Sequence, residues 1–301
     1  MINRREFFAL AASQAMAATP TQFQLACMTL PYSAFPLTRA LSGIKAAGYK
    51  YVAWGVNHKD ESGATKPALA VEASERDAAA LATRCRDMGL EPVMMFATVH
   101  LEAANALDAH LRRIAQAHAA RVPFLLTFGK TAPGEQEAFI RNLKAMAPRA
   151  SEAGVTIVVK QHGGNSGTGA ACTRILREVN EPSVRMCYDA GNVLDYEKLD
   201  PIPDIQTCWR DIRAFAIKDH RNTPRSEDCG PGFGEIDHYK LFQPVLQTGL
   251  TMPLAFENIF EPLVPRPSTA EGVDALARRA REYVATVLRG LNSFGGTKHE
   301  P

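Results

Sequence analysis

The sequence predicts a single (β/α)₈ barrel, in which eight parallel strands are each followed by a helix. Strand-like and helix-like segments alternate after residue 20, over a length that fits the roughly 250 residues of such a barrel. In the second half of the chain, four apolar runs each end in a cluster of polar residues, as barrel strands do at a catalytic face. An open doubly wound sheet would usually show a glycine-rich loop after its first strand, and this chain has none there.

Each element follows from a local pattern. Short apolar runs bounded by glycine and polar residues predict strands at 23–30, 51–56, 92–99, 122–128, 155–159, 184–188, 214–217 and 253–256. Apolar residues at helical spacing predict helices at 36–47, 74–88, 105–120, 135–153, 170–179, 203–211, 239–247 and 271–291. Ser74 is a good N-cap, and Gly48, Gly89 and Gly154 stand where helices end. The long polar stretches 58–71 and 221–237 would cover a substrate.

The N-terminus differs from the rest of the chain. Arg4 and Arg5 precede an alanine-rich apolar stretch and a small-residue site at 15–17, which is typical of a signal peptide over 1–18. The arginine pair, followed closely by two phenylalanines, resembles the twin-arginine (Tat) export motif. The Tat machinery would then be a partner of the precursor, and the mature protein would be periplasmic. The alternative is a cytoplasmic protein whose N-terminus is disordered or forms a short helix. We expect the barrel at 21–293 and a disordered tail at 294–301.

Composition excludes several classes of protein. The chain has 301 residues, of which 46% are hydrophobic, and its net charge of +2 comes without a basic stripe that would bind nucleic acid. The N-terminal apolar stretch is too short for stable membrane insertion. Six scattered cysteines without a CxxC pair predict buried thiols rather than a zinc site, although one isolated disulfide stays open. A homo-oligomer is compatible with the sequence.

The candidate catalytic residues stand at the ends of strands five to eight. Glu257 could act as a base, bind a divalent metal or hold sugar hydroxyls, and Asp189 could share the metal. Lys160 and Lys218 could stabilise an oxyanion, and a desolvated Lys160 could form a Schiff base. His162 lies on the same face as Lys160 and is a further catalytic candidate. The structural alternative is a salt bridge for Glu257 and Lys218, a turn cap for Asp189 and a hydrogen-bonded loop histidine for His162.

A second group of residues is expected to contact the substrate. Strand alternation places Asp219 on the opposite face from its two neighbours. An aromatic ring such as an indole can stack on a sugar face. The candidate substrate-binding residues are Asn192, Asp219, His220, Trp54 and His58, with His100 and Lys130 as weaker candidates.

Four motifs resemble the sugar phosphate isomerase/epimerase family, the xylose-isomerase-like TIM barrels. They are Asp189-Ala-Gly-Asn192, the Lys218-Asp219 pair, the Gly232-x-Gly234-x-Ile236-Asp237 turn and Glu257, and the resemblance covers nearly the whole mature chain. It implies one divalent cation (Mn, Mg or Zn), held by a Glu, an Asp, a His and a Glu on strands five to eight. It also implies transfer of a proton next to a carbonyl group, with the two Glu residues as acid and base.

This chain departs from the implied ligand set. Asp189 and Glu257 match two ligands, but Lys160 stands in place of the first Glu and Ala216 in place of the His. The Lys160-x-His-Gly-Gly pattern resembles one branch of the family. A cation in place of an anion opposes a dication, so Lys160 could bridge the two carboxylates where the metal would be.

A displaced metal site is the alternative. His162 or His220 could supply it with an imidazole ligand. A site without a metal is slightly favoured over one with a divalent metal.

Three functions remain open at this point. The first is an isomerase or epimerase that acts on a carbohydrate or keto-sugar through an enolate or enediol. The second is a lyase or hydratase that acts on keto-sugars or glycosides through the same enolate. The third is a sugar-binding barrel without catalysis. DNA-repair endonucleases of the same superfamily fit poorly, because they need more His and Glu metal ligands and a basic groove.

Overall fold

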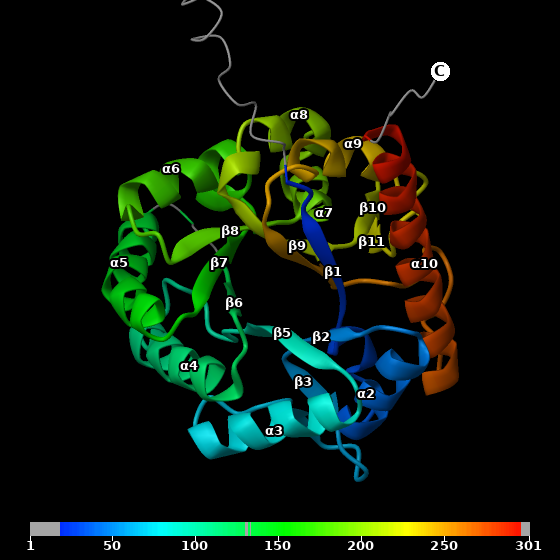
Figure 1. The fold of residues 1–301 in the computed structure, drawn as a ribbon, viewed down its shortest axis with the longest axis horizontal. Coiled ribbons are helices and arrows are strands. Elements are labelled where there is room, and N and C mark those ends of the chain that lie inside the picture. Colours follow the sequence, from blue (N-terminus) through cyan, green and yellow to red (C-terminus); the bar gives the residue numbers. More distant parts are fainter. Residues whose placement is uncertain (1–18, 130–131, 133, 296–301) are drawn as a thin grey trace, which may run out of the picture.

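A computed structural model describes residues 19–129, 132 and 134–295. Eight parallel strands close into one barrel in the order β1-β12-β9-β8-β7-β6-β5-β2, surrounded by helices (Figure 1). The predicted (β/α)₈ fold class is therefore confirmed. The predicted export signal at 1–18 and Lys130 lie outside the described residues.

The eight predicted strands are all present, with bounds that differ by a few residues. For example, the first strand ends at Met28 because Leu30–Tyr32 forms a short 3₁₀ helix containing Pro31. The barrel strands are β1 (Gln22–Met28), β2 (Tyr51–Trp54), β5 (Glu91–Phe96), β6 (Phe124–Thr127), β7 (Thr156–Lys160), β8 (Val184–Tyr188), β9 (Ile212–Ile217) and β12 (Thr251–Phe256).

Alternate residues of each strand face the lumen and the helices, because successive side chains of a strand point to opposite faces. One buried cluster fills the lumen, and a larger one lies between the strands and the helices. The lumen cluster consists of Met28, Ala53, Met94, Phe96, Leu126, Val158, Cys187, Ala214, Ala216 and Ala255.

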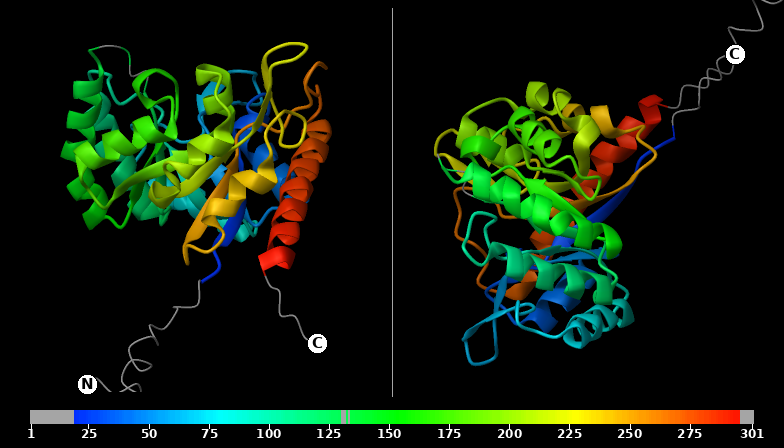
Figure 2. Two further views of the ribbon diagram at one scale, coloured as in Figure 1. Left: turned by 90° about the horizontal axis from the view of Figure 1, so that it is seen from above. Right: turned by 90° about the vertical axis from the view of Figure 1, so that its left-hand side faces the viewer.

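The helices lie around the outside of the barrel and flank the strands in side view (Figure 2). Ser74 forms a capping box with Asp77, as the sequence indicates. The helices are α2 (Leu37–Ala46), α3 (Glu75–Asp87), α4 (Ala106–Ala120), α5 (Gln136–Glu152), α6 (Gly169–Val179), α7 (Ala190–Glu197), α8 (Pro201–Gln206), α9 (His238–Phe242) and α10 (Ala270–Gly295). Among the described residues, no helix is both long and apolar enough to cross a membrane.

Some predicted elements differ from the observed ones. The predicted helix 203–211 is the short α8 followed by a 3₁₀ turn, and α9 gives way to a 3₁₀ turn containing Pro244. α10 runs to Gly295, into the predicted tail. The two long polar stretches contain hairpins: β3 (Asn57–Lys59) with β4 (Thr65–Pro67), and β10 (Asp219–Arg221) with β11 (Glu227–Cys229).

Candidate active site

Four barrel strands each place one charged side chain at the barrel mouth, which is the end where the carboxyl termini of the strands meet. Each charged residue follows a lumen residue by two positions and therefore continues the lumen face. The four pairs are Val158 and Lys160, Cys187 and Asp189, Ala216 and Lys218, and Ala255 and Glu257. We call Lys160, Asp189, Lys218 and Glu257 the charged quartet.

The quartet is a network of ion pairs. Lys160 Nζ lies 2.6 Å from Glu257 Oε2 and 3.2 Å from Asp189 Oδ2. Lys218 Nζ lies 3.5 Å from Glu257 Oε1 and 3.7 Å from Asp189 Oδ2. Each ammonium thus faces both carboxylates. The side chain of Glu257 is 14% exposed, so the quartet is reached from the mouth through this carboxylate.

Burial and pairing shift the pKa values of the quartet in ways that keep Glu257 and both lysines charged. Burial alone would lower the pKa of Lys160 and of Lys218, but the carboxylates outweigh it and raise both. Burial would raise the pKa of Glu257, but the two ammoniums lower it to about 2. At Asp189 burial prevails over the lysines, and the pKa is raised.

Asp189 also caps the helix that follows it. Its Oδ1 accepts a hydrogen bond of 2.9 Å from the Asn192 backbone N–H, at the start of α7, while Oδ2 faces the ammoniums. Gly191, two positions after Asp189, lies in the first turn of α7. A Cβ at Gly191 would lie 2.7 Å from Lys218 Cγ, so this glycine makes room for the lysine stem.

Two amide side chains hold the quartet in place. Lys218 Nζ donates a hydrogen bond of 2.5 Å to Asn192 Oδ1, and Asn192 Nδ2 donates one of 2.6 Å to the Gln161 carbonyl. The Gln161 side chain accepts a bond of 3.0 Å from the Asp189 backbone N–H. Asn192 therefore contacts a catalytic candidate and fixes its position, and Gln161 is a buried partner that the sequence did not single out.

His162 belongs to an aromatic wall beside the quartet. Its ring centroid lies 4.5 Å from that of Phe128 and 5.3 Å from that of Tyr196, and His100 is 6.0 Å away. Lys160 Nζ lies 5.3 Å from the same Phe128 ring, so Lys160 and His162 do share a side of the mouth. Burial and then the Lys160 charge lower the pKa of His162 to about 4, which keeps the imidazole neutral near neutral pH.

A cavity of about 260 Å³ opens beside the quartet. Glu257 and Lys218 form part of its wall, together with Asp228 and Arg266. Arg266 is an exposed side chain whose guanidinium lies over the Phe260 ring, 4.5 Å from its centroid. The cavity gives a small polar molecule access to the quartet.

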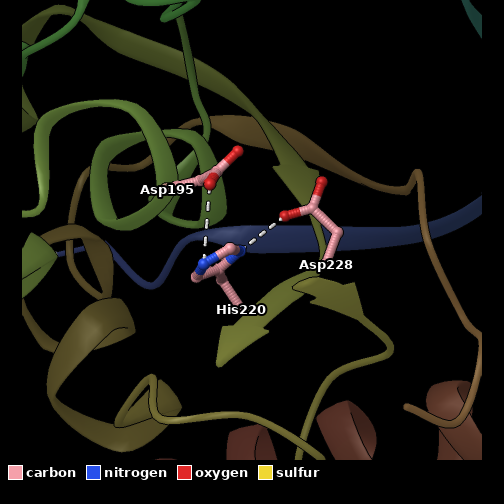
Figure 3. Close-up of side chains that lie close together, drawn as sticks. All are labelled: Asp195, His220 and Asp228. Carbon is pink, nitrogen blue, oxygen red and sulfur yellow. Dashed lines mark hydrogen bonds and ion pairs between the residues drawn. The ribbon is translucent and has the colours of Figure 1, made fainter. Parts of the chain in front are cut away.

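His220 lies between two carboxylates, of which Asp228 lines this cavity (Figure 3). Its Nδ1 is 2.9 Å from Asp228 Oδ1, and its Nε2 is 3.6 Å from Asp195 Oδ1. Lys218 Nζ donates to the other oxygen of Asp228 at 2.8 Å. A chain of polar contacts thus extends from Lys218 through Asp228 and His220 to Asp195 on α7.

The three residues Asp195, His220 and Asp228 could hold a metal ion, because one donor atom of each lies within 4.8 Å of the others. In this arrangement, however, the two carboxylates face different ring nitrogens, whereas a metal binds one nitrogen of an imidazole. The Lys218 ammonium beside Asp228 also opposes a dication. The cluster is a candidate metal site that would need a rearrangement of His220.

The metal position that the family resemblance implies does not fit this chain. The Lys160 ammonium already pairs with both remaining carboxylate ligands, and an ammonium has no lone pair for a metal. Ala216, in the lumen below Lys218, offers no donor where a His would be. We therefore derive no catalytic step from a metal at this position.

Three of the predicted substrate-binding residues make contacts outside the quartet. Asp219 accepts backbone N–H bonds from His220, Gly232 and Ile236 at 2.9–3.1 Å, so it shapes the glycine-rich turn. The buried His58 bonds Phe35 O and Thr29 Oγ1, which ties together two loops. Trp54 is buried in the outer cluster and cannot offer its ring to a sugar at the mouth.

Several mouth residues were not predicted. Phe128 follows the lumen residue Leu126 by two positions, so strand alternation alone could have found it. Asp195 and Tyr196 lie on α7, which the sequence analysis missed, and Asp228 lies on the unpredicted strand β11. No local sequence pattern indicates that Asp195, Tyr196 and Asp228 lie at the mouth, because this depends on where the hairpin and α7 pack in the folded barrel.

Comparison with solved structures agrees with the barrel fold. An L-ribulose 3-epimerase superposes with a TM-score of 0.71 at 17% identity, covering 93% of this chain and all (100%) of the other. A xylose isomerase-like TIM barrel protein from Mycobacterium smegmatis in complex with magnesium gives 0.67 at 14% identity, covering 91% and 97%. A probable 3-DHS dehydratase from Bacillus anthracis gives 0.62 at 11% identity, covering 86% and 98%. At these identities the likeness concerns the fold.

Sequence comparison identifies the family. No curated protein matches the chain. The model of the xylose isomerase-like TIM barrel family, however, matches residues 41–279, which include every member of the charged quartet. The chain belongs to the xylose isomerase-like TIM barrel family.

Proposed function

We propose that this protein is an isomerase or epimerase of carbohydrates that removes a proton next to the carbonyl group of a keto-sugar. The observation that supports this most is the position of Glu257. It is an ionised carboxylate at the mouth of a family barrel, with ammoniums at 2.6 and 3.5 Å. A base beside fixed cations is what enolate formation requires.

In the proposed reaction, Glu257 takes the proton from the carbon next to the carbonyl. Lys160 and Lys218 bind the oxygen on which negative charge develops, and preorganised cations in a buried site stabilise such charge strongly. While both ion pairs hold, a pKa of about 2 makes Glu257 a weak base. Its basicity rises when the substrate oxygen draws the ammoniums away.

The proton must then return to carbon or move between oxygens. His162 is neutral above its pKa of about 4 and lies on the Lys160 side of the mouth, so it is placed to exchange protons with a sugar hydroxyl. Return of the proton from Glu257 to the neighbouring carbon gives an isomer. Delivery of a solvent proton to the other face of the same carbon gives an epimer, and Glu257 then releases its proton to solvent.

A lyase is the second candidate. The likeness to a probable dehydratase favours it, because the same enolate can expel a substituent from the β-carbon. The residues would be the same, with the leaving group in place of the returning proton.

Incorporation of solvent deuterium tests both candidates. The protein is incubated in D₂O with a panel of ketopentoses and ketohexoses that includes D-fructose and D-allulose, and exchange is followed by proton NMR. We expect deuterium next to the carbonyl with wild-type protein and exchange slowed about 1,000-fold with Glu257→Gln, while the exposed Glu261→Gln serves as the matched control. An unsaturated product would identify a lyase. Sugar binding without exchange across the panel would contradict both.

Export to the periplasm by the Tat machinery is part of the proposal and rests on the sequence of residues 1–18. A reporter fused to residues 1–25 should be exported, and replacing Arg4 and Arg5 by lysine should abolish its export. A reporter that stays in the cytoplasm would contradict this part alone.

A further inference from the structure

We propose that the Lys160 ammonium takes the place of the divalent metal in this barrel, so that two lysines and no metal ion hold the negative charge at the site. The inference deepens the proposed function and rests on it for its meaning, but metal binding is measured independently of turnover. It departs from the cation that the family resemblance implies.

The first argument is the position of the ammonium. Lys160 Nζ lies 2.6 Å from Glu257 Oε2 and 3.2 Å from Asp189 Oδ2, the two carboxylates that match metal ligands. The lysine is only 3% exposed. An ammonium that pairs with both carboxylates has no lone pair to coordinate a metal. A dication between these carboxylates would have to displace the ammonium.

The second argument is the charge balance. A glutamate together with a dication adds one net positive charge to a site, and one ammonium adds the same charge. The substitution of Lys for Glu at position 160, combined with loss of the metal, therefore leaves the net charge of the site unchanged. If position 160 carried Lys and the metal also stayed, the site would have two more positive charges than a site with Glu and the metal. These charges would lie beside Lys218, whose Nζ already lies 3.5 Å from Glu257 Oε1.

The third argument is that the site lacks the further ligands that a metal would need. Ala216 lies in the lumen two residues before Lys218, and its side chain has no atom that binds a metal. Asp189 Oδ1 is engaged as the cap of α7. What remains, one oxygen of Asp189 and the Glu257 carboxylate, falls short of the three protein ligands of a typical catalytic site.

The test measures Mn²⁺ binding to the purified full chain by isothermal titration calorimetry, and its metal content by elemental analysis. We expect wild-type protein to hold no Mn²⁺ at the quartet. Lys160→Glu combined with Ala216→His should bind Mn²⁺ at least about 100-fold more tightly than wild type, since it restores two ligands and removes a cation. Lys160→Met removes the ammonium without adding a ligand and is the matched control. Its affinity for Mn²⁺ should rise far less.

Several outcomes decide the matter. Wild-type binding of one Mn²⁺ that is lost in both Asp189→Asn and Glu257→Gln overturns the inference. Binding that is lost only in Asp195→Asn places the metal at the His220 cluster and supports a metal-free quartet. If circular dichroism shows that the double variant is misfolded, Lys160→Glu alone replaces it. A folded variant that binds Mn²⁺ no more tightly than wild type counts against the inference.

Deuterium exchange in the presence of EDTA separates this inference from the proposed function. Exchange that persists in EDTA supports both. Exchange that needs added metal overturns the inference and leaves the proposed function standing. No exchange under any condition, together with a metal-free quartet, overturns the proposed function alone.

Discussion

Lys160 and Glu257, which lie 97 positions apart in the chain, meet at the barrel mouth in an ion pair of 2.6 Å. The pair joins strand β7 to strand β12, which are not neighbours in the barrel. Because a charge is costly to bury without its partner, each of these residues depends on the other for both stability and ionisation.

Replacing Lys160 by methionine should therefore weaken the fold as well as the reaction. Only Lys218 would remain to balance two buried carboxylates, and breaking a buried pair typically costs about 3 kcal/mol. We expect a loss of this size in the free energy of unfolding, measured by urea denaturation, and exchange slowed about 100-fold. Lys144→Met on the exposed face of α5 is the control and should change neither. An unchanged stability would contradict the ion-pair network.

Replacing Glu257 by glutamine should remove the base while keeping the shape of the site. We expect exchange to fall about 1,000-fold, within the range typical of a lost general base. In wild-type protein, the pKa of about 2 means that Glu257 stays ionised well below its usual pKa of 4.5. Protonation of Glu257 should therefore not lower kcat/KM near pH 4.5. If kcat/KM of wild-type protein does fall near pH 4.5, and this fall is absent in Asp189→Asn, then a group other than Glu257 controls the acidic limb.

His162 should make stability depend on pH. Its pKa falls from 6.5 to about 4 on folding, so between these values the unfolded chain binds more protons than the folded chain. The stabilising contribution is complete above pH 6.5 and is lost as the pH falls towards 4. Since the ring is half-buried, we expect a contribution of about 1 kcal/mol. His162→Gln should flatten this part of the stability profile, and an unchanged slope would contradict the assignment.

Gly191→Ala tests the space that Lys218 needs. An added Cβ would lie 2.7 Å from Lys218 Cγ, so the lysine stem must move and its bond to Asn192 must weaken. We expect kcat to fall about tenfold or more, because small displacements at a site are costly, while helix α7 itself gains from alanine. Gly290→Ala in α10 gives the same exchange of residues on a distant helix and should leave kcat unchanged.

The barrel and the quartet could be predicted because both depend on short-range patterns. Buried parallel strands are apolar runs, and a charged residue two positions beyond the last lumen residue must lie at the mouth. Trp54 shows the limit of this argument, since the end of a strand alone does not tell which face the last residue occupies. It follows the lumen residue Ala53 by one position and therefore faces the helices.

The parts that could not be predicted depend on long-range geometry. Asp228 reaches His220 only because β11 pairs with β10, and that pairing follows from a loop without a strong strand pattern. Helix α7 was missed because Gly191 suggests a turn, whereas the small residue is required by a lysine from another strand. Such requirements belong to the assembled barrel and not to the local sequence.

The two carboxylate oxygens of Asp189 make different contacts, and this limits the substitutions that the family can accept at this position. One oxygen sets the start of α7, the helix that presents Asn192 and Asp195, and the other faces the ammoniums. In the metal-free site that we propose, positions 160 and 216 do not carry the ligands that the family resemblance implies. Asp189 also caps a helix, so we expect this position to be the last to change.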